Sequence, residues 1–329
     1  MLLMLVLGIE TTCDETACAV VKDGREILSN VVFSQIDLHQ EFGGVVPELA
    51  CRKHVDVLFP VIDQALQEAS CKLEDIDLFS VAYGPGLIGA VLIGLNAIKT
   101  IALCMNKPYV GVNHIEAHLY AALMSNPHAE FPCLGIVLSG GHTSLICMHE
   151  IGKYELIGQT VDDAIGEAFD KVAKIMGLPY PGGPPIEALA EKGSSLRYPL
   201  KAGTVKGKPF DFSFSGLKTG VLYTYNLTSD KSDLAASFQY VAFSDILKKT
   251  LQAAEKYNCK TLVFGGGVTN NKALRKMFLE KGSHYTQYWP SLGLSLDNAA
   301  MIAGLAYHIY KHKGRGDDLT LEAATSISF

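Results

Sequence analysis

The order of apolar and polar residues along the chain predicts strands that alternate with helices. Short apolar runs bounded by polar or glycine-rich turns predict strands, and segments with apolar residues every three or four positions predict helices. The predicted strands include 2–9, 78–83 and 261–264, and the predicted helices include 53–70, 86–105, 163–176, 234–257 and 272–280. This alternation is typical of the α/β class. The segment 193–226 shows neither pattern and is expected to be an insertion or a mobile loop.

A hairpin pattern occurs twice, about 127 residues apart. Leu7-Gly8-Ile9 leads through a polar turn into 17–21, and 134–138 leads through a glycine-rich turn into 145–147. We therefore expect two lobes of similar design, 1–132 and 133–329, with the last helix able to pack back on the first lobe. A chance likeness between two short hairpins is the alternative.

Length and composition agree with two folded lobes. The chain has 329 residues, of which 48% are hydrophobic and 19% are charged, so it can bury substantial cores. The eight cysteines are scattered without a Cys-x-x-Cys pair, which favours free thiols in the cytoplasm over a disulfide framework. The apolar start is short and follows no basic region, so it predicts a core strand rather than a signal peptide, and no segment is expected to span a membrane.

The net charge of −6 argues against a protein whose whole surface attracts nucleic acid. Basic residues do gather locally, at Lys201, Lys206 and Lys208 and again in 308–315. These groups are either solvated surface or a local track for phosphates, and the sequence leaves both open.

A pair of histidines suggests metal chemistry. His114 and His118 lie four residues apart on a predicted helix, so both rings project from one face and can bind one ion. Asn113 is a good N-cap, and Glu116 stands where a capping-box carboxylate returns to the cap. Ile115 follows the first histidine, so the general base of the metalloprotease motif is missing. The alternative is that both histidines are ordinary polar residues, because the pair lacks a third ligand.

Asp297 is the candidate for that third ligand. It stands directly before an alanine-rich segment that predicts a helix. If Asp297 folds back onto the two histidines, the set becomes two imidazoles and one carboxylate with open positions, which suits Fe(II), Zn or Mn. Asp297 is otherwise a helix N-cap, and spacing alone does not decide between these roles.

Two glycine-rich turns are candidates for binding a phosphate or a nucleotide. In 139–143, adjacent glycines between two strands let backbone N–H groups approach an anion, unless the segment is a plain hairpin turn. In 265–271, three glycines join a strand to a helix whose N-terminus can face negative charge. The turn 84–89 matches the dinucleotide fingerprint formally, but Pro85 removes a backbone N–H, so a structural tight turn is favoured.

An acidic stripe is expected on the predicted helix 163–176. Asp163, Glu167 and Asp170 recur at intervals that place them on one face. Such a stripe can hold the hydroxyl groups of a ligand, although a solvated face is the more common outcome.

Seven motifs, in order along nearly the whole chain, together resemble the TsaD family. They are GIETTCDET at 8–16, GGVVPE at 43–48, NH at 113–114 with His118, SGGHT at 139–143, YPGGP at 180–184, FSFSGLKT at 212–219 and DNAA at 297–300. The GGVVPE segment resembles the bacterial branch. The resemblance implies a two-lobed fold of the ASKHA superfamily (actin, sugar kinase, Hsp70), with mixed sheets flanked by helices and a cleft between the lobes.

The resemblance also implies a reaction. A tRNA adenosine threonylcarbamoyltransferase moves the threonylcarbamoyl group from threonylcarbamoyl adenylate to N6 of adenosine 37 in tRNAs that read ANN codons, and releases AMP. The acceptor base lies in the single-stranded anticodon loop, where it can be splayed out at low cost.

The family pattern implies roles for individual residues. His114, His118 and Asp297 would bind one divalent metal ion per chain, Fe(II) or Zn, which polarises the carbamoyl carbonyl. The adenylate would be held by Leu138, Ser139, Gly140, Gly141, His142, Asp170, Gly183, Glu187 and Asn271. Glu10, Asp14 and Glu15 are candidates for the general base, and a structural role is the alternative for each.

The sequence departs from the family pattern at Thr12 and Ala17, where Ser and Gly are commoner, and at Leu296, where Thr is usual. None of these is expected to touch a proposed ligand. The family's habits imply partners besides tRNA: a TsaB-like dimer partner, a TsaE-like ATPase and a TsaC-like supplier of the adenylate, all in the cytoplasm and away from membranes.

Other functions remain open from the sequence. An ATP-dependent kinase or ATPase of the same fold is the first alternative, and a nucleotide-binding scaffold without enzymatic activity is another. A metallopeptidase is disfavoured by Ile115.

Overall fold

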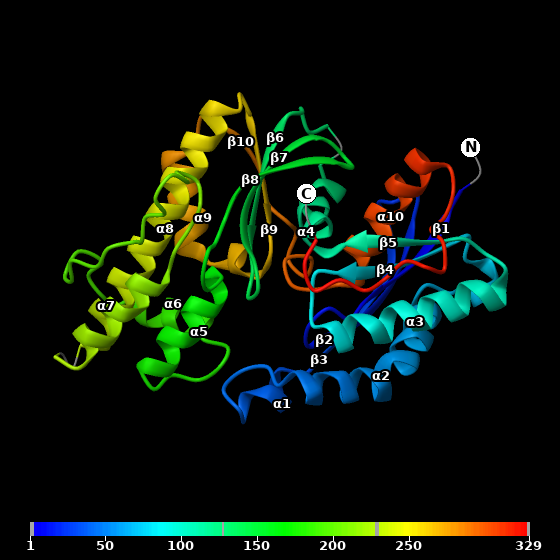
Figure 1. Ribbon diagram of the computed structural model, residues 1–329, viewed down its shortest axis with the longest axis horizontal. Coiled ribbons are helices and arrows are strands. Elements are labelled where there is room, and N and C mark those ends of the chain that lie inside the picture. Colours follow the sequence, from blue (N-terminus) through cyan, green and yellow to red (C-terminus); the bar gives the residue numbers. More distant parts are fainter. Residues whose placement is uncertain (1–2, 127, 228–229, 328–329) are drawn as a thin grey trace. The chain divides into compact units, whose positions relative to one another are not determined.

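The computed structural model describes residues 3–126, 128–227 and 230–327 (Figure 1). The chain divides into two compact units. Unit 1 comprises Met1–Pro127 and Pro290–Phe329, and unit 2 comprises His128–Trp289. The sequence-based division grouped 290–329 with the second half while allowing its helix to return to the first; by its contacts this segment belongs to unit 1.

Both units contain helices and one sheet each, so the α/β class is confirmed. Unit 1 contains β1 (Leu5–Glu10), β2 (Glu15–Lys22), β3 (Glu26–Ser34), β4 (Leu78–Gly84) and β5 (Tyr109–Asn113), with α1 (Ile36–Gln40), α2 (Pro47–Glu68), α3 (Ile88–Met105), α4 (His114–Met124) and α10 (Ala299–Lys313). Unit 2 contains β6 (Cys133–Leu138), β7 (Thr143–Glu150), β8 (Lys153–Gln159), β9 (Thr261–Gly265) and β10 (Thr286–Tyr288), with α5 (Ile165–Ile175), α6 (Gly183–Ala190), α7 (Ser215–Tyr225), α8 (Lys231–Lys256) and α9 (Lys272–Lys281).

The two sheets share one design. Their strand orders are β3-β2-β1-β4-β5 and β8-β7-β6-β9-β10. In each sheet the first strand of the unit pairs antiparallel with the second and parallel with the fourth. A tight hairpin produces the antiparallel pair, whereas the long helical connection produces the parallel pair. The similarity of the two lobes that was expected from the hairpin pattern is therefore confirmed.

Helices cover both faces of the sheet in unit 1. α2 and α3 pack on one face, and α10 packs on the other together with α4 (Figure 1). The predicted helix 53–70 begins earlier, at Pro47, because proline suits the first helical position. In unit 2, α8 begins where the Asp230 side chain accepts hydrogen bonds from Ser232 N and Asp233 N.

α3 has the length and apolar composition of a membrane-spanning helix, although no segment was expected to approach these. Among the described residues it is the one helix that is long and apolar enough to do so by length and composition. It packs against β4, β5 and α2, as a core helix does. Such a helix is therefore weak evidence for a membrane span.

The prediction of an insertion or mobile loop at 193–226 is wrong for its second half. Phe210, Phe212 and Phe214 are buried in the core of unit 2, and Phe212 forms an isolated bridge with Thr160. The Phe212 carbonyl accepts a hydrogen bond from Val161 N, and α7 follows directly. The overlooked signal is a spacing of two residues between aromatic side chains, which is the period of a strand.

α10 approaches β1 at backbone distance. A Cβ atom added to Gly8 would lie 2.7 Å from both Ala299 O and Ala303 N, so no side chain fits between strand and helix. Ala299, Ala300 and Ala303 are fully buried at this contact. Because α10 begins directly after Asp297 and Asn298, the contact fixes where Asp297 lies in unit 1.

We expect Gly8→Ala to destabilise unit 1 by about 1–3 kcal/mol, the usual cost of inserting a methyl group into a packed interior. Gly216→Ala is the control, because its added Cβ would meet open space on a helix and should be neutral or slightly stabilising. Urea unfolding of both variants measures the difference. A Gly8→Ala variant as stable as wild type would contradict the packing argument.

Candidate active site

α4 begins with the predicted cap. The Asn113 side chain accepts hydrogen bonds from Ile115 N at 2.9 Å and Glu116 N at 3.5 Å, so His114 is the first residue of the helix. The return bond of a capping box is not formed among the described residues. Glu116 is instead half-buried, and burial raises its pKa to about 7 despite the opposing effect of Lys313.

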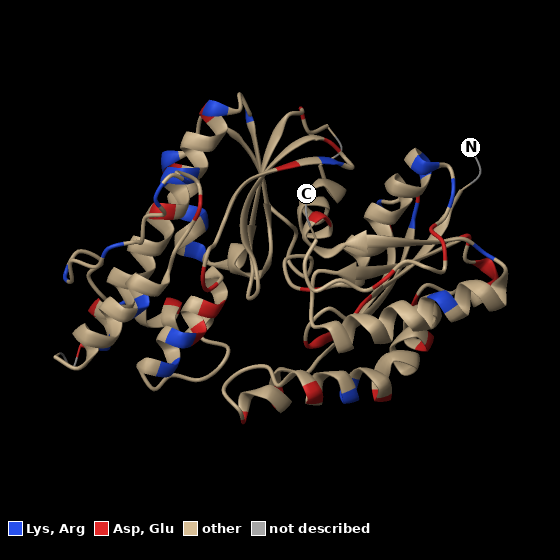
Figure 2. Cartoon of the chain, in the orientation of Figure 1, with Lys and Arg blue, Asp and Glu red and all other residues tan. Residues whose placement is uncertain are grey.

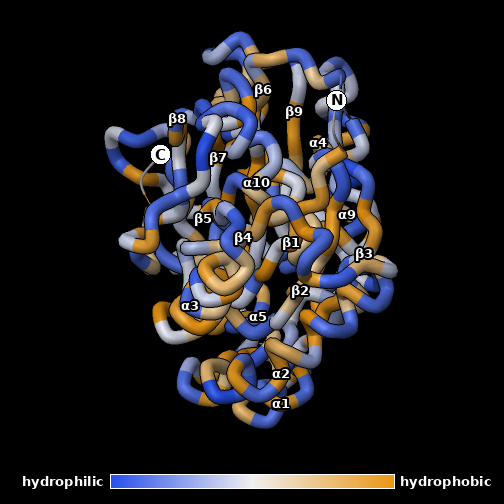
Figure 3. The backbone as a smooth tube through the Cα atoms, turned by 90° about the vertical axis from the view of Figure 1, so that its right-hand side faces the viewer, coloured by the Kyte–Doolittle hydropathy of each residue, from blue (hydrophilic) through white to orange (hydrophobic). Residues whose placement is uncertain are grey.

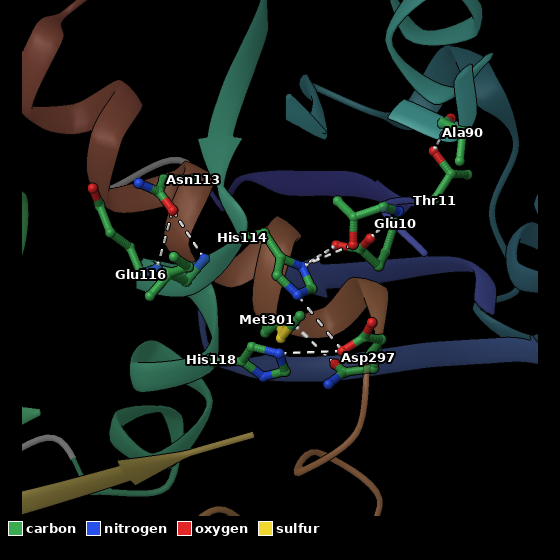
Figure 4. Close-up of polar contacts among 12 residues, drawn as sticks. Glu10, Thr11, Ala90, Asn113, His114, Glu116, His118, Asp297 and Met301 are labelled. Atoms are coloured by element: carbon green, nitrogen blue, oxygen red, sulfur yellow. Dashed lines mark hydrogen bonds and ion pairs between the residues drawn. The ribbon is translucent and has the colours of Figure 1, made fainter. Parts of the chain in front are cut away.

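The two histidines meet Asp297. His118 Nε2 lies 3.2 Å from Asp297 Oδ1, and His114 Nε2 lies 3.7 Å from the same oxygen (Figure 4). One ligand atom from each residue lies within 4.8 Å of the other two. Both histidines are buried, and the Asp297 side chain is 19% exposed, so the group is open on the aspartate side.

The residues fit a divalent metal ion. Both ring nitrogens of His118 are buried; within the described chain Nδ1 has no hydrogen-bond partner, and the one polar contact of Nε2 is its ion-pair approach to Asp297 Oδ1 at 3.2 Å. An unsatisfied buried polar group costs about 1–3 kcal/mol, so the ring lacks a partner that an ion would provide. Burial lowers the pKa of His114, but the carboxylates of Glu10 and Asp297 outweigh it and raise the pKa to about 9. The site therefore attracts positive charge, and its donor set suits zinc or Fe(II).

The three candidate general bases lie at the β1–β2 hairpin turn, Glu10 at the end of β1, Asp14 in the turn and Glu15 at the start of β2. Glu10 is fully buried; its Oε1 accepts from Thr12 N at 2.5 Å and its Oε2 lies 2.9 Å from His114 Nδ1. Asp14 is buried near the surface, at 8% exposure. Glu15 is half-buried, and burial, with the negative charges of Asp297 and Asp14, raises its pKa to about 10.

Thr12 does touch a proposed ligand. Its Oγ1 lies 3.2 Å from His114 Nδ1, so the expectation that no departure from the family pattern would do so is wrong. The substitution of Thr for Ser keeps the hydroxyl and therefore the contact. Thr12 O also accepts from Leu87 N at 2.8 Å, and a Cβ on Gly86 would lie 2.6 Å from Thr12 O. The turn 84–89 thus has the structural role that Pro85 indicated.

In unit 2, the turn 139–143 leaves backbone donors available. Ser139 N donates to His142 O at 2.9 Å, and His142 N donates to Ser139 Oγ at 3.0 Å, which closes the turn. The N–H groups of Gly140 and Gly141 make no hydrogen bond within the described residues, and an added Cβ would meet nothing within 4 Å at either position. An anion can therefore approach this backbone closely.

α5 connects this turn to the other proposed adenylate residues. Gly166 N, in its first turn, donates to Ser139 O at 3.1 Å, and a Cβ on Gly266 would collide with Leu138 O. Further along α5, Asp170 Oδ1 accepts from Gly182 N at 2.6 Å, directly before Gly183.

The remaining two residues meet at the start of α9. Glu187 Oε1 accepts from Lys272 N at 2.7 Å. Asn271 caps α9 through Ala273 N at 2.9 Å, and its Nδ2 donates to Gln239 Oε1 at 2.8 Å. Gln239 was missed from the sequence, because it belongs to no pattern with a chemical meaning of its own, whereas Thr12 was noted only as a departure from the family pattern.

The acidic stripe does not act as a unit. Asp163 is paired with Lys171 and Lys218, and Glu167 lies 2.7 Å from Lys171 Nζ. Burial raises the pKa of Asp163, but its bonds to the two lysines outweigh this and lower it. Asp170 alone of the three contacts the proposed adenylate segment, through Gly182 N.

Comparison with known proteins shows which family this chain matches. The family model TsaD, tRNA N6-adenosine threonylcarbamoyltransferase, matches residues 26–304. The chain belongs to the TsaD family. A TsaD relative from Protochlamydia amoebophila (strain UWE25) with that enzyme name is 63% identical over 334 residues, covering 98% of this chain and 97% of the relative. A second relative of the same name, from Bacillus subtilis (strain 168), is 48% identical and covers 95% of this chain and 92% of its own.

Solved structures outside the TsaD family share the fold. The match to HypF from T. kodakarensis covers 95% of this chain and 48% of the HypF chain, with a TM-score of 0.66 and 14% identity. Component A of (R)-2-hydroxyglutaryl-CoA dehydratase from Acidaminococcus fermentans matches 96% and 100%, with a TM-score of 0.58 and 17% identity. The shared fold agrees with the expected α/β class of mixed sheets flanked by helices, whereas a cleft between the lobes stays a prediction.

We expect the purified wild-type protein to bind one equivalent of zinc or Fe(II), and His118→Ala to weaken that binding by more than about 10-fold, since loss of a ligand exceeds the usual effect of losing an outer contact. Metal analysis after dialysis and competition with a chromophoric chelator measure it. His149→Ala, at an exposed histidine paired with Glu155, is the control and should bind metal normally. Equal affinity in the two variants would rule out the site.

Proposed function

We propose that this chain transfers the threonylcarbamoyl group from threonylcarbamoyl adenylate to N6 of adenosine 37 in tRNAs that read ANN codons, releasing AMP. Family membership establishes the class, threonylcarbamoyl transfer to adenosine of tRNA. The observation that carries the mechanism is the convergence of His114, His118 and Asp297, whose ligand atoms lie within 4.8 Å of one another with both histidines buried.

The difficult step is attack by an amine that is a poor nucleophile on a weakly electrophilic carbonyl. A divalent ion, Fe(II) or Zn, held by His114, His118 and Asp297 would supply Lewis-acid polarisation of that carbonyl. Asp14 and Glu15 are the proposed proton acceptors for the N6 amine, because they lie at the same hairpin turn beside the metal site and, unlike Glu10, are not fully buried. Glu10 is left out of this role, because both of its oxygens are engaged in the interior.

The leaving AMP needs stabilisation of its phosphate. Gly140 and Gly141 present N–H groups that are unused within the described residues, and donors aimed at developing charge lower the barrier. The remaining residues proposed for the adenylate are Leu138, Ser139, His142, Asp170, Gly183, Glu187 and Asn271. Their segments are joined by direct contacts through α5 and α9.

The chain has a net negative charge, whereas its proposed RNA substrate is a polyanion, and the uneven distribution of charge between the units makes the two compatible. Unit 2 has 18 Lys and Arg against 15 Asp and Glu, a net +3, whereas unit 1 has 10 against 19, a net −9. Lys and Arg recur over the helices of unit 2 (Figure 2). We propose that tRNA phosphates are met by unit 2, with the exposed Lys201, Lys206 and Lys208 among the contacts.

A protein partner is proposed for the outer face of unit 1. α2 and α3 border a groove of about 390 Å³ lined by apolar side chains that include Leu58, Phe59 and Ile101. Phe59 is 61% exposed, and hydrophobic segments are interspersed with hydrophilic ones along α2, whereas α3 is mostly apolar (Figure 3). Exposed apolar surface of this kind marks a protein interface. We propose that the TsaB-like partner covers it, and that the TsaE-like ATPase joins the assembly, which acts on tRNA in the cytoplasm.

Depletion of the protein from its host is expected to remove threonylcarbamoyladenosine from hydrolysed tRNA, as measured by mass spectrometry. Re-expression of wild type or of His149→Ala should restore the nucleoside, whereas Asp297→Ala should not, because it removes the carboxylate ligand. Unchanged nucleoside after depletion would refute the assignment. Restoration by Asp297→Ala would refute the metal-dependent mechanism while leaving the family assignment intact.

Phe59→Lys is expected to weaken binding of a TsaB-like protein by about 10-fold or more, because a charge replaces an aromatic anchor of the groove. Isothermal titration with the purified partner measures the affinity. Asp56→Lys on the same helix but outside the groove lining is the control for added positive charge. An equal loss of affinity in both variants would show that added charge alone weakens binding. Unchanged affinity in both variants would mean that the partner binds another surface.

A further inference from the structure

Glu10 lies behind His114, on the side of the ring away from Asp297. The ring presents Nε2 toward Asp297 and Nδ1 toward the Glu10 carboxylate, at 3.7 Å and 2.9 Å (Figure 4). The other carboxylate oxygen accepts a hydrogen bond from the backbone N–H of Thr12 at 2.5 Å, so both oxygens of the carboxylate are engaged. Glu10 is fully buried.

This arrangement decides which nitrogen of His114 is free to bind a metal ion. A carboxylate is a pure acceptor, so the nitrogen that faces it carries the proton. With Nδ1 protonated, the lone pair of Nε2 points toward Asp297, where His118 Nε2 also lies. An outer carboxylate of this kind orients a histidine ligand and raises its basicity.

The two histidines of the site differ in this respect. His118 Nδ1 is buried and has no hydrogen-bond partner among the described residues, whereas His114 Nδ1 faces both Glu10 and the Thr12 hydroxyl. Glu10 also contributes a second negative charge beside that of Asp297. Together the two charges balance a divalent cation in a buried setting, where an unbalanced charge is costly.

We propose that Glu10 is the positioning residue of the metal site: it fixes His114 as the Nδ1–H tautomer and so presents Nε2 to the ion. The inference rests on the proposed metal site. It assigns Glu10 a place behind the ligand rather than the general-base role that the sequence left open.

The sharpest test is Glu10→Gln, which keeps the size of the side chain. The carboxylate accepts from two donors, Thr12 N and His114 Nδ1, but an amide has one oxygen. The amide N–H₂ group therefore faces Thr12 N–H or His114 Nδ1; in the second case it favours the Nε2–H tautomer, which cannot ligate. Glu10→Gln should weaken zinc binding about 10–100-fold, the range for outer-contact variants, and as much as Glu10→Ala does. A residue with a merely structural role would tolerate the isosteric change.

Two readouts apply to metal binding itself. Chelator competition gives the zinc affinity, and the visible spectrum of the Co(II)-loaded protein reports the ligand geometry. Thr11→Val is the matched control: Thr11 is buried next to Glu10 and donates to Ala90 O at 2.9 Å, away from the histidines (Figure 4). It should keep the wild-type affinity and Co(II) spectrum.

A measurement on the wild type covers the case in which a Glu10 variant does not fold. With ¹⁵N-labelled histidine, the zinc-loaded protein should show His114 protonated at Nδ1 and metal-bound at Nε2. Metal bound at Nδ1, or a Glu10→Gln variant with wild-type affinity and spectrum, would overturn the proposal. If wild type and His118→Ala both fail to bind zinc, the metal site itself fails, which is a different outcome.

Discussion

The backbone contact between α10 and β1 is the constraint on which unit 1 depends. Gly8 admits the carbonyl of Ala299 and the amide of Ala303 at a distance that excludes any side chain. The same helix packs on α4, where a Cβ on Gly304 would lie 2.7 Å from the Tyr120 ring. Small residues therefore set the position of α10 on two sides. Asp297, which precedes the helix by two residues, is carried to the histidines of α4 as a consequence.

Electrostatics explain why this position suits an ion. Glu10 and Asp297 flank His114, Asp14 lies in the turn after β1, and Glu15 begins β2. Burial and the negative charges of Asp297 and Asp14 raise the pKa of Glu15 to about 10, so ionisation of this carboxyl group is disfavoured unless a positive charge lies nearby. A divalent cation would favour the ionised forms. The acids that crowd this turn are thus tolerable in the interior because they share one compensating charge.

Unit 2 has the same sheet design but a different proposed role, which is to bind the adenylate. Its turns leave backbone N–H groups unpaired within the described residues while other hydrogen bonds fix their conformation. The Ser139 side chain and the first turn of α5 close the loop around Gly140, and Asp170 fixes the next glycine segment through Gly182 N. Side chains that the sequence predicts to bind a ligand therefore also form hydrogen bonds that hold segments of unit 2 together. Asn271 caps α9 while Gln239 holds its amide, so the orientation of its side chain is set within the unit.

Local patterns predicted much of the fold. The repeated hairpins, the cap at Asn113 and the i, i+4 spacing of His114 and His118 follow from interactions between neighbours in sequence, and the structure has them all. The aromatic residues at 210–214 follow an equally local period of two, but they lie between polar loops and were read as a mobile segment.

Contacts between distant segments required the tertiary structure. The meeting of Asp297 with the histidines depends on how α10 packs on β1. The contacts of Thr12 and Glu10 with His114 depend on the order of the strands in the sheet, in which β4 lies between β1 and β5. The physical reason is that hydrogen-bond caps and periodic burial act over a few residues, whereas the position of one element on another is set by packing summed over the whole interface. The sequence by itself determined which elements form and which side chains can bind a metal ion; only the packed structure decided that they face one another.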